Sequence, residues 1–187
     1  MAMENEFEYY VMNSKGDDTY PLLKVVGRKY TEEGLESLLY LEFNDPVPQN
    51  PVMADFLSGP YDFVSGRIAD VMKSFDMEGV EFIPGELTDH KGRTIKDYYC
   101  INVECNTYEA MDKVKSDYEY DEDVDCYWVN KIVLDKEVLK QIPSNRRLGF
   151  RLEEKPGYFL YHKSIVDAII TANPTGVVFR NIEDFEF

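Results

Sequence analysis

The sequence contains no long apolar run. No stretch approaches the roughly 18 apolar residues that a membrane-spanning helix needs, and residues 1–6, MAMENE, have neither the positive charge nor the apolar segment of a secretory leader. Cysteine is scarce as well. Three cysteines, Cys100, Cys105 and Cys126, include no CxxC pair, which is typical of reduced thiols and not of a disulfide framework. We therefore expect a soluble, cytoplasmic protein that makes no contact with a membrane.

Positive charge is also in short supply. The chain has 20 lysine and arginine residues against 36 aspartate and glutamate residues, a formal net charge of −16. Such an excess opposes binding to the phosphates of nucleic acid or to an anionic membrane. It suits a protein partner with a basic surface, and it suits equally well a protein whose acidity serves only solubility.

The motifs of common enzymes and metal sites are missing. Neither GxGxxG nor GxxxxGK[ST] occurs, and FVSG at residues 63–66 lacks the first glycine of a GxSxG elbow. The alternating aspartates of residues 121–125 match the first three ligand positions of an EF-hand loop. Cys126 and Ile132, however, stand where that loop needs glycine and a bidentate glutamate. We expect no cofactor, no metal and no enzymatic activity.

Two polar clusters leave alternatives open. An enzyme of unfamiliar type could use His162 with Cys100, Cys126 or Glu154, although a lone histidine beside a helix start more often makes structural hydrogen bonds. A basic spot could form an anion pocket, or it could make ion pairs with Glu153, Glu154 or the acidic segment described below. The residues of this spot are Arg146, Arg147, Arg151 and Lys155.

Apolar residues are plentiful and patterned. They make up 44% of the chain, enough for a substantial core. The clearest pattern is in residues 127–170. It predicts a strand at 128–134, a helix at 135–142 capped by Asp135, a hairpin of strands 147–153 and 158–161 around a turn at 156–157, and a helix at 164–173 capped by Ser164.

The remaining segments follow the same rules. The sequence predicts strands at residues 7–12, 20–26, 38–43, 80–83, 95–103 and 177–180, a helix at 65–75 capped by Ser65, and a turn at 89–92. Four prolines between residues 44 and 60 exclude regular helix or central strand and predict an ordered loop that packs against the body through Val52, Met53, Phe56 and Leu57. We predict one α+β domain over residues 1–187, with N-terminal strands in 1–42 and the rest in 43–187. About three short helices pack against a mainly antiparallel sheet.

Several sequence blocks resemble a known bacterial family. The blocks are FNDPVP at 43–48, MAD at 53–55, GP at 59–60, GVEFIP at 79–84, KIVLD at 131–135, RLGFRL at 147–152 and NPTGV at 173–177. From about Phe43 to the end, the chain is similar to immunity proteins of polymorphic toxin systems, in the immunity protein eleven family, first catalogued as a domain of unknown function. The resemblance implies protection against a cognate toxin by binding it, and it supplies no catalytic motif. A regulatory or housekeeping binding protein with no toxin partner is the alternative.

One acidic segment is the candidate binding site. It places six carboxylates in nine residues, Asp117, Glu119, Asp121, Glu122, Asp123 and Asp125. Mutual repulsion at this density predicts an exposed loop. Such a loop could enter a basic toxin cleft as a phosphate mimic, or it could be a solvated loop without a partner. Homo-oligomers remain possible.

Overall fold

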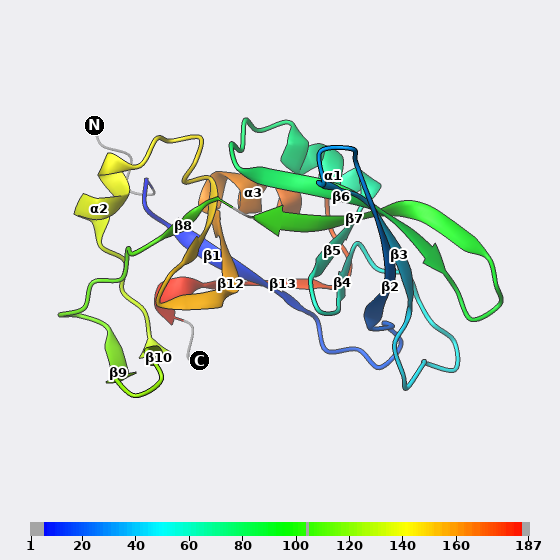
Figure 1. The fold of residues 1–187 in the computed structure, drawn as a ribbon, viewed down its shortest axis with the longest axis horizontal. Helices are drawn as coiled ribbons and strands as arrows, with labels where there is room; N and C mark the ends of the chain where they lie inside the picture. Colours follow the sequence, from blue (N-terminus) through cyan, green and yellow to red (C-terminus); the bar gives the residue numbers. More distant parts are fainter. Residues whose placement is uncertain (1–5, 104, 185–187) are drawn as a thin grey trace.

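Two large β-sheets and three short helices form most of the protein (Figure 1). The computed structural model describes residues 6–103 and 105–184. Residues 1–5, on which the expectation of no secretory leader rests, lie outside the described part. Within that part, no helix is both long enough and apolar enough to cross a bilayer.

The first large sheet has five strands in the order β13-β1-β12-β11-β8. Their bounds are β1 Tyr9–Ser14, β8 Thr107–Tyr108, β11 Gly149–Leu152, β12 Lys155–His162 and β13 Val177–Asn181. All neighbours are antiparallel except β8 and β11, which run parallel. The first strand of the sequence, β1, therefore pairs with two of the last, β12 and β13.

The second large sheet has six strands in the order β2-β3-β6-β7-β5-β4. Their bounds are β2 Leu23–Tyr30, β3 Glu36–Phe43, β4 Phe56–Ser58, β5 Asp62–Ser65, β6 Val80–Thr88 and β7 Thr94–Val103. The sheet curls so far that its two edges approach each other. A Cβ placed on Gly59, after β4, would lie 2.4 Å from the Leu23 carbonyl oxygen of β2, and Arg28 donates a hydrogen bond of 2.6 Å to the Tyr61 hydroxyl.

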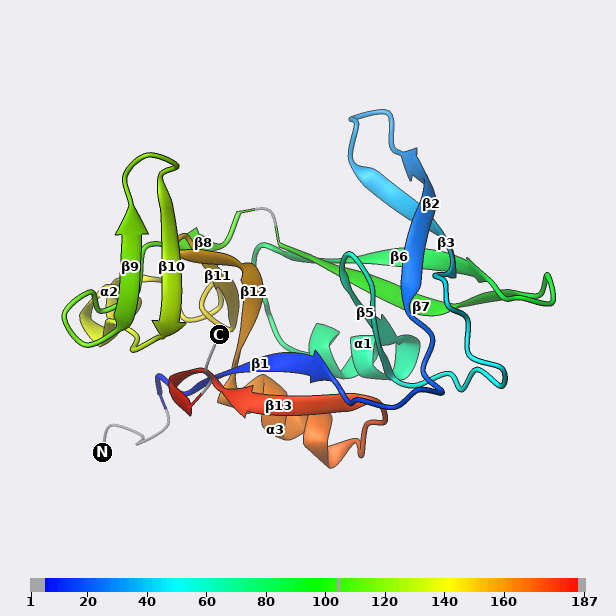
Figure 2. The ribbon, with the colours of Figure 1, turned by 90° about the horizontal axis from the view of Figure 1, so that it is seen from below.

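The helices lie on both sides of the five-stranded sheet. Their bounds are α1 Gly66–Lys73, α2 Lys136–Gln141 and α3 Lys163–Thr171, with a 3-10 turn at Ile182–Asp184. Helices α1 and α3 contact each other near the middle of the molecule (Figures 1 and 2). Ile68 of α1, Ile165 of α3 and Tyr161 of β12 share the core there. Helix α2 buries Leu139 in a separate core with Phe150 of β11.

The α+β prediction is confirmed, and three helices lie where the apolar periodicity placed them. The prediction of a mainly antiparallel sheet is correct only in part. The strands divide among three sheets, and the pairs β3–β6 and β8–β11 are parallel. Strand periodicity indicates which face of a strand is buried. It does not indicate which strand will be its hydrogen-bonded neighbour, or in which direction that neighbour runs.

Three local predictions are wrong in detail. The hairpin turn expected at residues 156–157 lies at 153–154, because Leu152 pairs with Lys155 and Pro156 belongs to the start of β12, where a strand tolerates proline. Ser65 precedes α1 but makes no side-chain cap. At α3 the cap is His162, whose Nδ1 accepts a hydrogen bond from the Ser164 amide, and Ser164 itself lies within the helix.

The proline-rich segment is ordered against the six-stranded sheet, as expected. Ala54, Phe56 and Leu57 are buried, and Phe56 begins the short edge strand β4. Val52 differs from the prediction because half of its surface faces solvent. An edge strand next to a proline-rich segment is compatible with the missing amide donors of proline.

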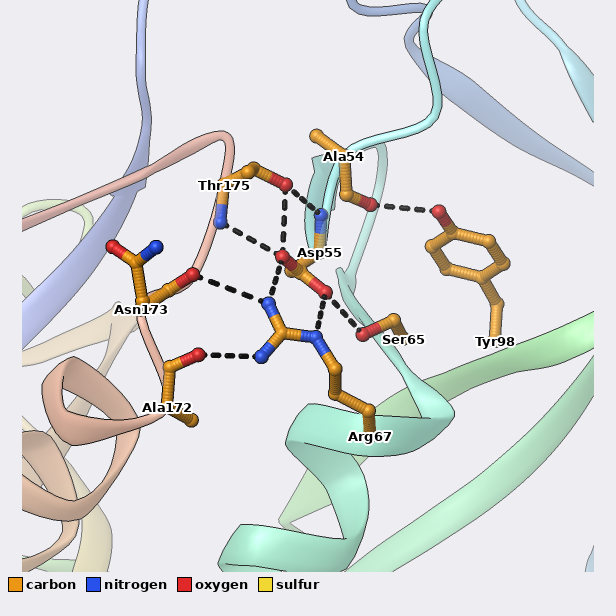
Figure 3. Close-up of polar contacts among 8 residues, drawn as sticks. All are labelled: Ala54, Asp55, Ser65, Arg67, Tyr98, Ala172, Asn173 and Thr175. Atoms are coloured by element: carbon orange, nitrogen blue, oxygen red, sulfur yellow. Dashed lines mark hydrogen bonds and ion pairs between the residues drawn. The ribbon is translucent and has the colours of Figure 1, made fainter.

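Asp55 in this segment holds three parts of the chain together (Figure 3). Its carboxylate accepts hydrogen bonds from the Ser65 hydroxyl at 2.8 Å, from Arg67 Nε and Nη2 at 3.0 and 2.5 Å, and from the amide and hydroxyl of Thr175, both at 2.8 Å. Arg67 also donates to the carbonyl of Ala172, after α3, at 2.5 Å. One buried carboxylate thus links the proline-rich segment, the start of α1 and the turn between α3 and β13.

The hydrogen bonds around Asp55 stabilise the charged form of its carboxylate. Burial favours the neutral acid, but the hydrogen bonds from Arg67, Thr175 and Ser65 outweigh that effect and hold the pKa of Asp55 below its ordinary value. A lowered pKa means that folding stabilises the charged form of Asp55 relative to its neutral form. The contribution to stability is therefore present above about pH 4 and is lost as the pH falls through the folded-state pKa.

We expect Asp55→Asn to lower the free energy of unfolding by about 2 kcal/mol at pH 7, because Arg67 loses its counter-charge and Thr175 and Ser65 lose charged acceptors. Urea unfolding followed by circular dichroism measures the change. Asp70→Asn, on the exposed face of α1, is the matched control and should change stability by less than about 0.5 kcal/mol. Equal effects of the two substitutions at pH 7, or an Asp55→Asn effect that persists at pH 2, would contradict this account.

Candidate functional site

The acidic segment forms a hairpin with its own two-stranded sheet, β9 Asp117–Asp121 and β10 Cys126–Lys131. The register pairs Tyr118 with Val129 and Tyr120 with Tyr127 on one face of the hairpin. Glu119 pairs with Trp128, and Asp121 with Cys126, on the other face. The hairpin projects beyond the five-stranded sheet (Figure 2). It therefore has an aromatic inner face and an acidic outer face.

The inner face attaches the hairpin to the body. Val129 is 3% exposed and packs in the core that also contains Ile132 and Leu139. The Tyr127 ring lies 5.6 Å from the ring of Tyr118 and 4.8 Å from that of Tyr120, measured between centroids, and the Lys113 ammonium lies 5.2 Å from the Tyr127 centroid. These contacts correct the prediction of an exposed loop. Tyrosines alternating with carboxylates at 117–121 give a strand one apolar face despite its charge.

The hairpin carries all six candidate carboxylates, and four of them, Glu119, Asp121, Glu122 and Asp123, line one pocket. Asp117, Glu119 and Asp121 come from β9, and Glu122, Asp123 and Asp125 come from the turn. The turn is braced from within: the Asp123 amide donates to Asp121 Oδ1 at 3.0 Å, and the Tyr120 hydroxyl donates to Asp125 Oδ1 at 2.5 Å. The carboxylates are therefore presented on an ordered scaffold.

Sequence reasoning missed Trp128. The sequence predicts Trp128, the only tryptophan in the chain, in a strand at 128–134 but does not indicate that its side chain faces solvent. In the structure it is 62% exposed on the outer face of the hairpin, opposite Glu119. It lines a pocket of about 430 Å³ together with Tyr120 and the carboxylates of Glu119, Asp121, Glu122 and Asp123. The signal that could have found it is the alternation DYEYD at 117–121, which predicts a partner strand with one wet face.

The hairpin does not assemble a metal site. Within residues 6–103 and 105–184, no three histidine, cysteine, aspartate or glutamate side chains are grouped so that they could hold a metal ion. The arrangement is one of negative charges around an exposed aromatic ring. Its chemistry is recognition of cationic groups by charge and by cation–π contact.

The residues of the enzyme alternative lie apart. His162 is partly buried, and burial lowers its pKa; its Nε2 lies 3.2 Å from the Glu6 carbonyl oxygen and its Nδ1 2.8 Å from the Ser164 hydroxyl. Cys100 belongs to the core of the six-stranded sheet, whereas Cys126 is exposed on the hairpin. Glu154 is buried, which raises its pKa, and it accepts a hydrogen bond from the Met111 amide. Each polar group has a structural environment of its own.

The basic spot makes ion pairs, but with partners that differ from those expected. Arg146 Nε lies 2.9 Å from Glu78 Oε1, and Arg147 Nη2 lies 2.8 Å from Glu6 Oε1. Arg151 donates to the Pro156 carbonyl at 2.6 Å. The side chains reach different segments of the chain because Arg146 and Arg147 lie in the turn before β11, whereas Arg151 lies on β11.

Asp62 is a partly buried acidic group that the sequence did not single out. It lies on β5 on the same side as Val64, which packs in the core shared by α1 and α3. Burial raises the pKa of Asp62 to about 6, against the opposing effect of the Arg151 charge. A raised pKa means that the charged form of Asp62 is less stable in the folded protein than in the unfolded chain. The free energy of unfolding therefore falls as the pH rises from about 4 through 6.

We expect Asp62→Asn to raise the free energy of unfolding at pH 8 by about 1 kcal/mol, after allowance for partial solvent access, because the amide carries no charge to bury. The gain should shrink as the pH falls towards 4, where Asp62 is protonated in the folded state. Thermal unfolding at pH 4, 6 and 8 measures the difference, with the exposed Asp18→Asn as control. A gain that is independent of pH would argue against titration of Asp62.

Comparison with known protein families gives a match over most of the chain. The model of a family described as Imm11, an immunity protein family, matches residues 35–184. This range includes the acidic hairpin, the Asp55 network and all three helices, and it leaves out β1 and β2. No curated protein matches the chain at a significant level.

Proposed function

The chain belongs to the Imm11 immunity protein family, and from this premise we propose that it protects a bacterial cell by binding and neutralising a cognate toxin domain. The proposed mechanism is stoichiometric occlusion without catalysis. The docking surface is the outer face of the β9–β10 hairpin. The observation that carries the proposal is the exposure of the single tryptophan, Trp128, beside the four carboxylates that share its pocket, Glu119, Asp121, Glu122 and Asp123.

Charge gives the hairpin its preference for a basic partner. Along β9, Asp117, Glu119 and Asp121 repeat every second residue and are therefore about 7 Å apart. A row of carboxylates with this spacing can occupy a cleft whose lysines and arginines bind successive phosphates. The net charge of −16 extends the attraction beyond the contact surface and accelerates encounter, which is how complementary charge mainly acts.

Trp128 gives the hairpin an anchor. Exposed tryptophans are unusual on a surface that has no partner, and tryptophan is enriched among the residues that dominate binding energy. An arginine or lysine of the toxin could stack on the indole while the flanking Glu119 and Asp121 neutralise its charge. The carboxylates would then govern the association rate, and the indole would govern the dissociation rate.

The order of the hairpin favours this use. Tyr118, Tyr127 and Val129 hold the strands against the body, and hydrogen bonds within the turn brace Asp121 and Asp125. A preorganised surface loses less conformational entropy on binding than a free loop does. The alternative of a regulatory binding protein with no toxin partner is distinguished by the neighbouring gene, since the proposal expects one that encodes a protein with a toxin domain.

We expect the association rate with the toxin domain encoded by that neighbouring gene to fall steeply as salt rises from 20 to 500 mM. The four substitutions Asp121→Asn, Glu122→Gln, Asp123→Asn and Asp125→Asn, made together, should flatten this dependence and slow association at least tenfold at low salt, because they remove most of the local charge. Surface plasmon resonance measures both rates. Trp128→Ala should accelerate dissociation at least tenfold, a loss of about 1.4 kcal/mol.

The matched control removes four exposed carboxylates elsewhere, at Asp17, Asp18, Glu32 and Glu33. It changes the net charge by the same amount and should reduce the association rate far less. Circular dichroism confirms that each variant is folded. If the hairpin variants and the control have equal rates, the docking surface lies elsewhere; if no variant and no wild-type protein binds the toxin, toxin neutralisation itself is refuted.

A further inference from the structure

A second pocket lies far from the hairpin, between the proline-rich segment and the tip of the β6–β7 hairpin. Its volume is about 270 Å³, close to the lower end of the range for small-molecule sites. Phe43 and Ile95 provide apolar surface from β3 and β7, and Val52 from the proline-rich segment forms an apolar rim that is 49% exposed. The His90 ring stacks on Phe43 with centroids 6.1 Å apart. One side of the pocket can therefore hold an apolar or aromatic body.

Hydrogen bonds within the turn at residues 89–92 hold His90 and Lys91 in place at the pocket. Asp89 Oδ1 accepts hydrogen bonds from the amides of Lys91 and Arg93 at 2.8 and 2.9 Å, and Oδ2 accepts one from Arg93 Nε at 2.7 Å. The Arg93 amide and guanidinium and the Lys91 amide together lower the pKa of Asp89 to about 2. The carboxylate is thus engaged by its own turn, while His90 and Lys91 line the pocket.

The formal charge of its lining residues distinguishes this pocket from two other pockets of the molecule. Lys91 and Arg93 outnumber Asp89, so the lining carries a formal charge of +1 with histidine neutral. The pocket at the acidic hairpin carries −4, and a third pocket, beside the start of α2, carries −2. A net positive lining on a chain with a net charge of −16 is a local reversal of sign. The amide side chains of Gln49 and Asn50 add hydrogen-bond donors on the opposite wall.

We propose that this pocket binds a small organic carboxylate with an apolar body. The apolar body lies against Phe43, His90 and Val52, and the carboxylate faces Lys91 and Arg93. This site is independent of the toxin-binding hairpin, and its ligand class follows from the chemistry of the lining alone. Charge selects the anionic group, and the stacked rings select a flat or bulky body.

The test uses 3-phenylpropionate as the probe, with the neutral 3-phenylpropanamide and the cationic 3-phenylpropylamine as matched compounds. Proton NMR of the histidine rings reads the site directly, because the chain has only two histidines. His90 lines the pocket, whereas His162 caps α3 and serves as the internal control. We expect the carboxylate to shift the His90 resonances with a dissociation constant on the order of 1 mM, the amide to bind at least about fivefold more weakly, and the amine to leave them unmoved.

Three variants locate the binding within the pocket. Lys91→Ala should weaken the carboxylate about fivefold, and Val52→Asp, a substitution at an exposed rim position, should abolish its binding by repulsion. Lys96→Ala is the matched control, since Lys96 lies on β7 outside the lining and pairs with Glu86 at 2.7 Å. No shift at His90 with any probe, amine binding as strong as carboxylate binding, or equal effects of the two lysine variants would overturn the proposal.

Discussion

The buried carboxylate of Asp55 is the interaction on which the arrangement of the two large sheets depends. Through Arg67 and Thr175 it joins the start of α1, which follows strand β5 of the six-stranded sheet, to the turn between α3 and β13 of the five-stranded sheet. Apolar packing between α1 and α3 favours contact but tolerates small slides, whereas a carboxylate with five hydrogen bonds defines one geometry. The apolar core supplies most of the stabilisation, and Asp55 selects the register in which that core forms.

The candidate binding surface is formed by the outer face of the β9–β10 hairpin. In the β9–β10 hairpin, period-two alternation separates the two faces: Tyr118, Tyr127 and Val129 pack against the body, while Glu119 and Trp128 face outwards. Substitutions on the outer face should therefore have little effect on folding. This separation is compatible with the proposed role of the outer face in binding a toxin.

The two sites of opposite charge lie near opposite ends of the molecule, the acidic hairpin at one end and the tip of β6–β7 at the other (Figure 1). Because exposed charges are screened beyond about 8–10 Å at physiological salt, each site is governed by its own lining more than by the total charge of −16. Because the hairpin and the pocket beside His90 lie far apart, the two proposed binding sites can be tested separately.

The sequence by itself determined the α+β class, the three helices, the main strands and the position of the acidic segment, because these depend on periodicity, capping and local charge. It also placed Asp135 correctly as a helix cap. Tertiary structure decided the division into three sheets, the parallel pairs β3–β6 and β8–β11, the conversion of the acidic segment into a hairpin, and the roles of Ser65 and His162. It also decided that Trp128 faces solvent and that Asp62 is partly buried. These features depend on which distant segment supplies a partner, and one sequence records the preferences of each segment but not the free energy of their pairings.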